Sequence, residues 1–266
     1  MAHAWEITEK NCYNYLKDTF SDSAVFKHRG GSDASHSDIL VKTHSGKQFY
    51  IEAKSIQSQS GQFVLLPEYN TQQFVYSPLN KSPRNEYTSQ IINYMNSEFD
   101  NFCCAGTQGL SIALPKEIFY SWAVTEYLYI KKAEYFIVQT AQDFVLFPTQ
   151  ELPEFFDISA CYRIKKSGSS EPARKDMPLL TQILMAKFNI SDVIRKGKKL
   201  FVRSTDDIDN QRIIYNGHQI LLSRRSDIYE VRKLSNTKNA NVIFSIKYAP
   251  NKTGLNTSEF TKILQS

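Results

Sequence analysis

Hydrophobic and polar positions follow a helical period at the start of the chain and a strand period soon afterwards. Residues 4–20 carry apolar side chains at three- and four-residue steps, which predicts an amphipathic helix. Its apolar face is formed by Trp5, Cys12, Leu16 and Phe20. Short runs of β-branched and aromatic residues then predict strands. The predicted strands lie near residues 23–27, 38–41, 49–54 and 62–66. We expect residues 55–61 to form a turn and residues 67–84 a long loop.

The rest of the chain alternates helical and strand patterns and then becomes almost entirely β. The expected helices span residues 85–99, 117–132 and 178–195. The expected strands span residues 135–138, 144–147, 160–165, 200–203, 211–215, 218–223, 228–234 and 240–248. This order predicts an α/β or α+β fold. The change of character near residue 196 predicts a domain over residues 1–195 and a β-rich C-terminal part over residues 196–266.

One predicted hairpin places two carboxylates opposite each other. If residues 44–46 form a three-residue loop with glycine in the left-handed conformation, Thr43 pairs with Lys47. Counting back from that pair along both strands, Asp38 lies opposite Glu52, with about 5 Å between the Cβ atoms. Two carboxylates at that distance repel each other unless a cation sits between them.

The chemistry of this hairpin suits a metal-dependent phosphodiesterase. Hard cations such as Mg²⁺ take oxygen ligands, which Asp38 and Glu52 can supply. Lys54 shares one strand face with Glu52, because side chains alternate between the two faces. A lysine there can orient a water or offset charge on a phosphate. The alternative is an ordinary hairpin with charged residues on a solvated face.

Ser37-Asp38 followed by Glu52-Ala53-Lys54 resembles the PD-(D/E)XK nuclease motif, with serine in place of the usual proline. The resemblance implies a restriction-endonuclease-like fold, in which a mixed central sheet is flanked by helices. It implies that Asp38, Glu52 and Lys54 are catalytic. It also implies Mg²⁺ as the cofactor, bound by Asp38, Glu52 and the main-chain carbonyl of Ala53.

Glu9 lies on the apolar face of the first predicted helix, where an unpaired charge is costly. In several nuclease families with the motif above, a glutamate from the first helix reaches the metal site. The resemblance therefore makes Glu9 a further candidate catalytic residue. The alternative is a glutamate at the boundary of the apolar face, with its carboxylate in water.

Composition narrows the class of protein only slightly. The formal net charge is +5 and the pI about 8.8, which is compatible with a polyanionic partner. No stretch of 18 apolar residues predicts a membrane span, and the first residues do not resemble a signal peptide. The four cysteines lack the spacing of a zinc site and favour reduced thiols in the cytoplasm.

Basic stretches in the second half of the chain are candidates for contact with nucleic acid. Lysine and arginine neutralise phosphates, and serine hydroxyls can approach them closely. The first stretch contains Lys165, Lys166, Ser167, Ser169, Ser170, Arg174 and Lys175. Further clusters lie at residues 195–199 and at Arg224 and Arg225. The alternative for each cluster is a solvated surface segment.

Within this family the sequence favours a type II restriction endonuclease acting on double-stranded DNA. The chain has no G-x-x-x-x-G-K-[ST] segment, so no nucleotide cofactor is expected. About 200 residues follow the hairpin, enough for loops that read a DNA sequence. A two-strand cut in palindromic DNA would imply a homodimer. A restriction system would place the protein in the prokaryotic cytoplasm.

Two other functions stay open at this stage. Residues 29–32 and 51–55, with Asp38 and Glu9, also resemble an archaeal-type Holliday junction resolvase, although such proteins would cover only about half of this length. The chain could instead be a non-catalytic DNA-binding module that keeps the fold, but the intact Asp38, Glu52 and Lys54 argue against a dead site.

Overall fold

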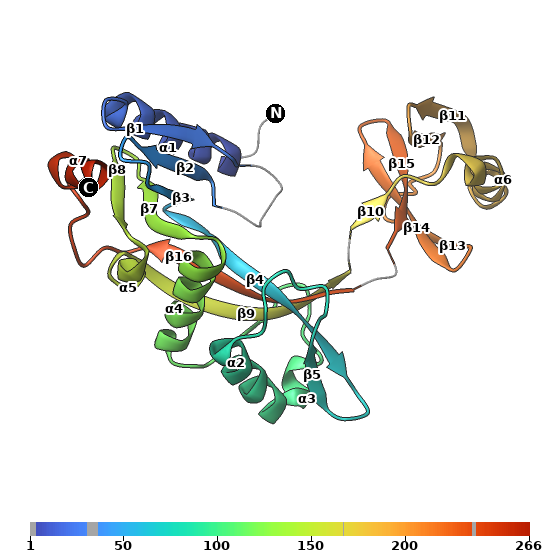
Figure 1. Ribbon diagram of the computed structural model, residues 1–266. Helices are drawn as coiled ribbons and strands as arrows, with labels where there is room; N and C mark the ends of the chain where they lie inside the picture. The colour runs from blue at the N-terminus through green and yellow to red at the C-terminus, as the bar shows by residue number, and fades with distance from the viewer. Residues whose placement is uncertain (1–3, 31–36, 167, 236–237) are drawn as a thin grey trace. The chain divides into compact units, whose positions relative to one another are not determined.

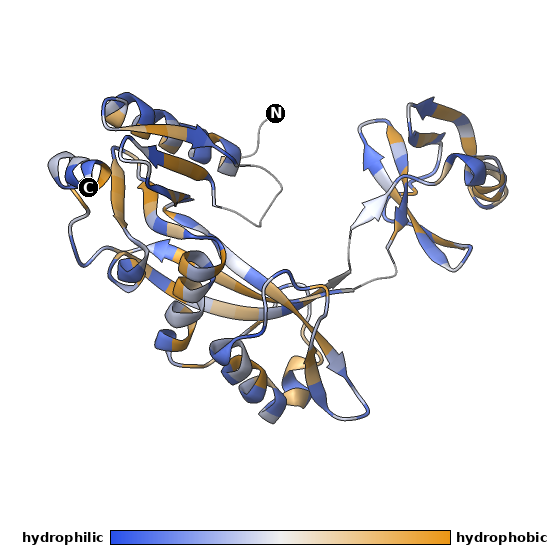
Figure 2. Ribbon diagram, in the orientation of Figure 1, coloured by the Kyte–Doolittle hydropathy of each residue, from blue (hydrophilic) through white to orange (hydrophobic). Residues whose placement is uncertain are grey.

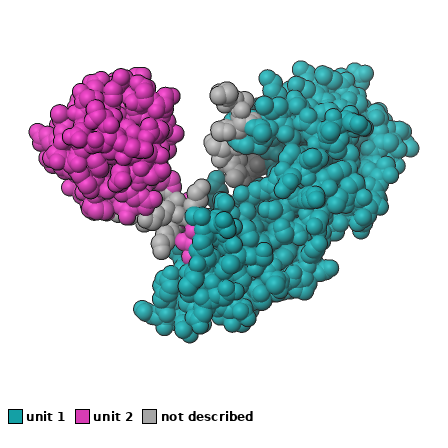
Figure 3. Space-filling view, turned by 180° about the vertical axis from the view of Figure 1, so that it is seen from behind, with its two compact units in different colours: residues 1–163, 240–266 teal, residues 164–239 magenta. Residues whose placement is uncertain are grey.

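The chain folds into two compact units, which Figure 3 shows in different colours. The computed structural model describes residues 4–30, 37–166, 168–235 and 238–266. Unit 1 consists of residues 1–163 and 240–266, and unit 2 of residues 164–239. The structure therefore divides the chain differently from the boundary expected near residue 196. The reason is that the last strand, β16 (Lys238–Tyr248), joins a sheet with β4 and β9 of unit 1.

One of the sheets of unit 1 is a five-stranded mixed sheet (Figure 1). The strand order is β1-β2-β3-β7-β8, with β3 and β7 parallel and the other pairs antiparallel. The strands are β1 (Ala24–His28), β2 (Ile39–Thr43), β3 (Gln48–Ser55), β7 (Ala133–Gln139) and β8 (Phe144–Pro148). This mixed sheet, flanked by helices, confirms the fold class predicted from the sequence.

Two helices from opposite ends of the chain, α1 (Ala4–Phe20) and α7 (Thr257–Gln265), share one hydrophobic core with this sheet. α1 has the predicted bounds, but Trp5 is 47% exposed, because the buried part of its apolar face begins only at Cys12. α7 was not predicted, although its capping box and its two buried apolar residues, Phe260 and Leu264, are visible in the sequence.

Aromatic side chains connect the sheet to the helix α4 (Lys116–Val124) and its π-helical continuation (Thr125–Ile130). The ring of Tyr127 meets that of Phe136 edge-on, at 4.9 Å between centroids. Phe136 stacks on Phe147, which stacks in turn on Phe155 of α5 (Leu152–Phe155). Most of β8 has the hydrophobic colour in Figure 2. This layer fixes the π-helix against β7, the strand next to β3.

A second sheet of unit 1 has the strand order β5-β4-β16-β9-β6. Its other strands are β4 (Gln57–Glu68), β5 (Gln73–Tyr76), β6 (Leu110–Ser111) and β9 (Phe156–Lys166). The helices α2 (Glu86–Ser97) and α3 (Phe99–Phe102) lie between β5 and β6 in the chain. The predicted turn at 55–61 and the predicted loop at 67–84 are therefore wrong in part. Polar residues 57–62 form a strand because they pair with β16, a partner almost 200 residues away.

Unit 2 contains a sheet of order β11-β12-β15-β14-β13, with β10 paired to β15. Its strands are β10 (Ser169–Ser170), β11 (Ile190–Lys196), β12 (Lys199–Ser204), β13 (Arg212–Tyr215), β14 (His218–Arg225) and β15 (Ile228–Leu234). The predicted helix at 178–195 is too long: α6 (Met177–Lys187) ends where the backbone of Phe188 becomes extended. The hairpin predicted at Asn216 and Gly217 is confirmed, since both residues have positive φ.

Two further features bear on the class of protein. No helix among the described residues is long and apolar enough to cross a membrane. All four cysteines are free thiols, as the sequence predicted.

Candidate active site

The hairpin between β2 and β3 has the register that the sequence predicted. The backbone N–H of Thr43 donates to the carbonyl of Lys47 at 3.0 Å, and Gly46 has a φ of +93°. The pairing of β2 with β3 then counts back to Asp38 opposite Glu52. A turn of three residues thus determines which carboxylates meet at the far end of the hairpin.

Asp38, Glu52 and Lys54 lie together at that end. The ammonium of Lys54 is 2.7 Å from Oε1 of Glu52, and both side chains are largely buried. Oδ2 of Asp38 accepts a hydrogen bond from the backbone N–H of Ala53 at 2.9 Å. Ile51 and Ala53, which alternate with Glu52 and Lys54 along β3, belong to the hydrophobic core that includes α1, and this confirms the predicted alternation of faces.

Burial and neighbouring charges give the two carboxyl groups opposite properties. Burial, together with the charge of Glu52, raises the pKa of Asp38 to about 8, although the cation of Lys54 acts in the other direction. Burial would also raise the pKa of Glu52, but the cations of Lys54 and Lys131 outweigh it, and the pKa lies below its ordinary value. Without a bound cation, Asp38 is therefore the carboxyl group that holds a proton at neutral pH.

The raised pKa of Asp38 predicts a pH-dependent gain of stability for Asp38→Asn in metal-free buffer. The pKa is about 8 in the folded protein and about 3.9 in an unfolded chain, so the Asp38 contribution to stability is lost as pH rises through this window. Asparagine stays neutral, and its amide oxygen can still accept from Ala53. We expect the variant to be more stable than wild type at pH 8, and the difference to shrink toward pH 5. Urea unfolding with a chelator measures it, and an equal difference at both pH values would contradict the assignment.

Lys54 keeps its proton in this environment. Burial lowers the pKa of an ammonium group, but the carboxylate of Glu52 outweighs burial, and the pKa lies well above its ordinary value. Lys54 is therefore suited to donate hydrogen bonds and to stabilise negative charge, and unsuited to remove a proton.

Glu9 of α1 lies near the two carboxyl groups and pairs with a residue that the sequence did not single out for the site. Burial raises the pKa of Glu9, while His28 lowers it through a hydrogen bond and its charge. Nε2 of His28 is 3.4 Å from Oε2 of Glu9. Gly30 permits this approach, because a Cβ atom there would lie 2.0 Å from Oε2 of Glu9. The contact joins α1 to β1, so no local sequence pattern could have indicated it.

Lys131 is a second residue near the site that no sequence pattern indicated. It caps the π-helix, and its ammonium is 4.6 Å from the centre of the Tyr127 ring. The ammonium of Lys54 is 5.4 Å from the centre of the same ring. In the sequence, Lys131 resembles any basic residue at the end of a helix, and only the parallel pairing of β3 with β7 brings it near Glu52.

The donors at the hairpin end fit a hard divalent cation. Oγ of Ser37 and Oε2 of Glu52 are buried and have no hydrogen-bond partner within the described part of the chain. Such atoms are costly unless a ligand satisfies them, and all the donors are oxygens, as Mg²⁺ prefers. In residues 4–30, 37–166, 168–235 and 238–266, no three His, Cys, Asp or Glu side chains cluster as a metal site. The candidate set is therefore two carboxylates with the main-chain carbonyl of Ala53.

The residues predicted to contact nucleic acid belong to unit 2. The described ones differ in whether they are exposed or already paired with other residues of the unit. Ser169 and Ser170 form β10, and Arg174 and Lys175 are exposed on a 3-10 turn (Arg174–Asp176). The side chains of Lys165 and Lys166, and the whole of Ser167, lie outside the described residues.

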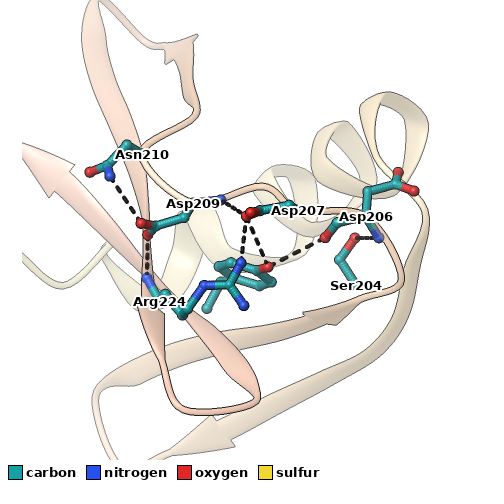
Figure 4. A network of polar contacts seen from close by, with 7 residues as sticks. Ser204, Asp206, Asp207, Asp209, Asn210 and Arg224 are labelled. Atoms are coloured by element: carbon teal, nitrogen blue, oxygen red, sulfur yellow. Dashed lines mark hydrogen bonds and ion pairs between the residues drawn. The ribbon is translucent and has the colours of Figure 1, made fainter.

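Arg224 and Arg225 are engaged within unit 2. Figure 4 shows the guanidinium of Arg224 against Asp207 and its backbone N–H against Asp209. Arg225 pairs with Glu230 at 2.9 Å. About half of each arginine side chain is exposed, so both can still face a ligand, but part of their charge is already compensated.

Comparison with known proteins gives one informative match. No model of a protein family matches the chain, and no curated protein matches it. A solved structure of the HhaI endonuclease in complex with DNA matches with a TM-score of 0.73 and 36% sequence identity. The match covers 98% of this chain and 98% of that chain.

Proposed function

The chain belongs to the type II restriction endonuclease family of HhaI, and we propose that Asp38, Glu52 and Lys54 perform a Mg²⁺-dependent hydrolysis of phosphodiester bonds in double-stranded DNA. The observation that carries this assignment is the register of β2 and β3, which brings a buried aspartate and a buried Glu52–Lys54 pair to one end of the hairpin. An ordinary solvated hairpin would not bury these three ionisable groups.

Each residue has a role that follows from its surroundings. Asp38, Glu52 and the carbonyl of Ala53 would hold Mg²⁺, which when bound polarises the phosphate and lowers the pKa of a water. The backbone N–H of Ala53 fixes the orientation of the Asp38 carboxyl group. Lys54, which stays protonated, orients the attacking water and stabilises charge on the phosphate oxygens.

We also propose that Glu9 acts at this site. Its carboxylate occupies space that is free only because Gly30 has no side chain. Gly30→Ala is expected to displace the carboxylate of Glu9 and to lower the cleavage rate by about 10- to 100-fold. Its stability should change little, because the atoms that must move are the tips of two side chains, and the φ of Gly30 is not positive. Gly106→Ala is the matched control, since nothing lies within 4 Å of a Cβ at Gly106. Equal cleavage rates for the two variants would contradict a role of Glu9 in cleavage.

The distribution of charge supports unit 2 as the part that contacts the DNA backbone. Unit 2 holds 16 lysines and arginines against eight aspartates and glutamates, a formal net charge of +8. Unit 1 holds 16 against 19. Because phosphate contacts depend on positive charge, we assign most of the sequence-independent affinity to unit 2. Lys165, Lys166, Ser167, Ser169, Ser170, Arg174, Lys175, Arg224 and Arg225 remain the candidates.

Arg174 is the candidate that tests base recognition most directly. If its guanidinium reads a base edge, Arg174→Ala should cost about 1–3 kcal/mol of binding free energy, and only on the cognate duplex. A Lys165/Lys166 double alanine should weaken cognate and random duplexes alike and flatten the salt dependence. Affinities at two salt concentrations separate the two effects. Unchanged binding of both proteins would mean that recognition lies elsewhere in the chain.

Cleavage of plasmid DNA in Mg²⁺ tests the proposed function against its alternatives. Discrete fragments that disappear with a chelator are the expected result. Cutting of branched DNA alone would indicate a Holliday junction resolvase, and binding without cutting would indicate a non-catalytic module. We place the protein in the prokaryotic cytoplasm, where restriction systems act and where four free thiols stay reduced.

The same experiment tests the proposed homodimer. One chain offers one candidate site, so a cut in both strands needs either two copies or two successive cuts. A dimer on DNA should convert supercoiled plasmid directly to linear product. A nicked form that accumulates first would contradict the dimer and indicate a single chain that cuts one strand at a time.

A further inference from the structure

We propose that Lys131 is a second cationic residue of the active site, which binds a backbone phosphate of the strand being cut. This inference rests on the proposed nuclease function. Its starting point is the position of Lys131 at the end of a π-helix that packs against the strand next to β3. Single π-helical turns inside α-helices often occur at functional sites.

The backbone around Lys131 is fixed to the catalytic hairpin. The carbonyl of Lys132 accepts a hydrogen bond from the N–H of Tyr50 on β3, at 3.3 Å. Lys132 has a φ of +60°, an uncommon conformation for a residue with a side chain. The backbone therefore turns sharply after Lys131, and β7 begins beside the strand that carries Glu52 and Lys54.

The ring of Tyr127 contacts the ammonium groups of both Lys131 and Lys54. The ring centre lies 4.6 Å from the ammonium of Lys131 and 5.4 Å from that of Lys54. Both distances are within the range of a cation–π interaction, and Tyr127 itself is buried. Either ammonium group would lose its contact with this ring if it moved out into solvent.

Both lysines line one cavity of about 480 Å³ in unit 1. Gln59, Gln62 and Ser82 add polar groups to the wall, and the one carboxylate among the described lining residues, that of Glu126, accepts a hydrogen bond from Ser82 at 2.8 Å. A hollow that contains the catalytic Lys54, a second ammonium and several hydrogen-bond donors suits an anionic, polar ligand such as a phosphodiester.

The two ammonium groups differ in their partners. Lys54 forms an ion pair with Glu52, whereas Lys131 has no carboxylate at ion-pair distance within the described residues. Burial lowers the pKa of Lys131, but Tyr127 and Glu52 outweigh burial, so the group stays charged. A charge that is partly withdrawn from water gains most from an anion that enters the same cavity. The phosphate of the DNA is that anion.

Lys131→Met tests the proposal through cleavage and binding together. Single-turnover cleavage should fall by about tenfold or more, and Lys131→Arg should restore part of the rate because it keeps the charge. Lys132→Asn is the matched control: it removes the neighbouring exposed charge and keeps a residue that accepts positive φ. Thermal unfolding of each variant shows whether the fold is intact, and Lys131→Gln serves if the methionine variant does not fold.

Substitution of single phosphates by neutral methylphosphonates separates a phosphate contact from a structural role. Wild-type protein should lose affinity at several positions near the cut. At one position the loss should disappear in Lys131→Met, because the contact is already gone, while Lys132→Asn keeps it. The proposal would be overturned if Lys131→Met cut at the wild-type rate. It would also be overturned if, at every position, the affinity loss caused by the methylphosphonate added to that caused by Lys131→Met. Failure of wild-type protein to cut unmodified DNA would instead reject the nuclease function itself.

Discussion

Asp38→Asn and Glu52→Gln are each expected to reduce DNA cleavage about 10³-fold or more and to leave DNA binding nearly unchanged. Both changes keep the shape of the side chain and remove a negative oxygen from the donor set for Mg²⁺. Binding should survive because most of its free energy comes from phosphate contacts, which we assign to the basic unit 2. The loss therefore lies in the chemical step.

Cleavage under single-turnover conditions and duplex affinity with a chelator measure the two effects separately. Calorimetric titration with Mg²⁺ adds a readout independent of activity, since each variant should bind the ion more weakly than wild type. Glu134→Gln is the matched control, because this carboxylate lies on the neighbouring strand β7 but pairs at the surface with Lys47. Wild-type cleavage by Asp38→Asn would reject the assignment, as would unchanged affinity of both variants for Mg²⁺.

The catalytic hairpin could be derived from the sequence because local interactions determine it. A three-residue loop ending in Gly46 sets the register, and alternation along β3 sets the faces. No partner outside the hairpin is needed for Asp38 to lie opposite Glu52. The bounds of α1 were predicted for the same reason, since its apolar period extends over four turns of a single segment.

Features that depend on distant partners could not be derived in this way. The polar residues 57–62 are in a strand because they pair with β16, and β16 joins unit 1 because its partners are β4 and β9. The contacts of His28 with Glu9 and of Lys131 with Tyr127 likewise join separate elements. The helix predicted over 178–195 was too long for a different reason. Ile190, Val193 and Ile194 fit both a helical and a strand period, and these residues form a strand because they pair with β12.

Lys54→Ala is expected to lower the cleavage rate by about 10²-fold or more, with a smaller change in DNA affinity. The ammonium of Lys54 is buried, protonated and 2.7 Å from Glu52, so it is held where it can act on the phosphate and the water. Its removal also leaves the buried Glu52 carboxylate without its nearest cation. Breaking a buried ion pair in this way costs about 3–5 kcal/mol of stability, so the metal-free variant should unfold at lower denaturant concentration.

The two consequences of losing Lys54 can be separated because Mg²⁺ compensates only one of them. A bound divalent ion can neutralise Glu52, so saturating Mg²⁺ should restore much of the stability of Lys54→Ala. It should not restore the rate, because the donor that orients the water and stabilises the phosphate is still absent. Unfolding and single-turnover cleavage, each measured across a Mg²⁺ titration, test this difference. Lys42→Ala on β2 is the control, since its side chain is exposed on the same hairpin. A rate that recovers together with stability, or falls less than a few-fold at any Mg²⁺ concentration, would limit Lys54 to a structural role.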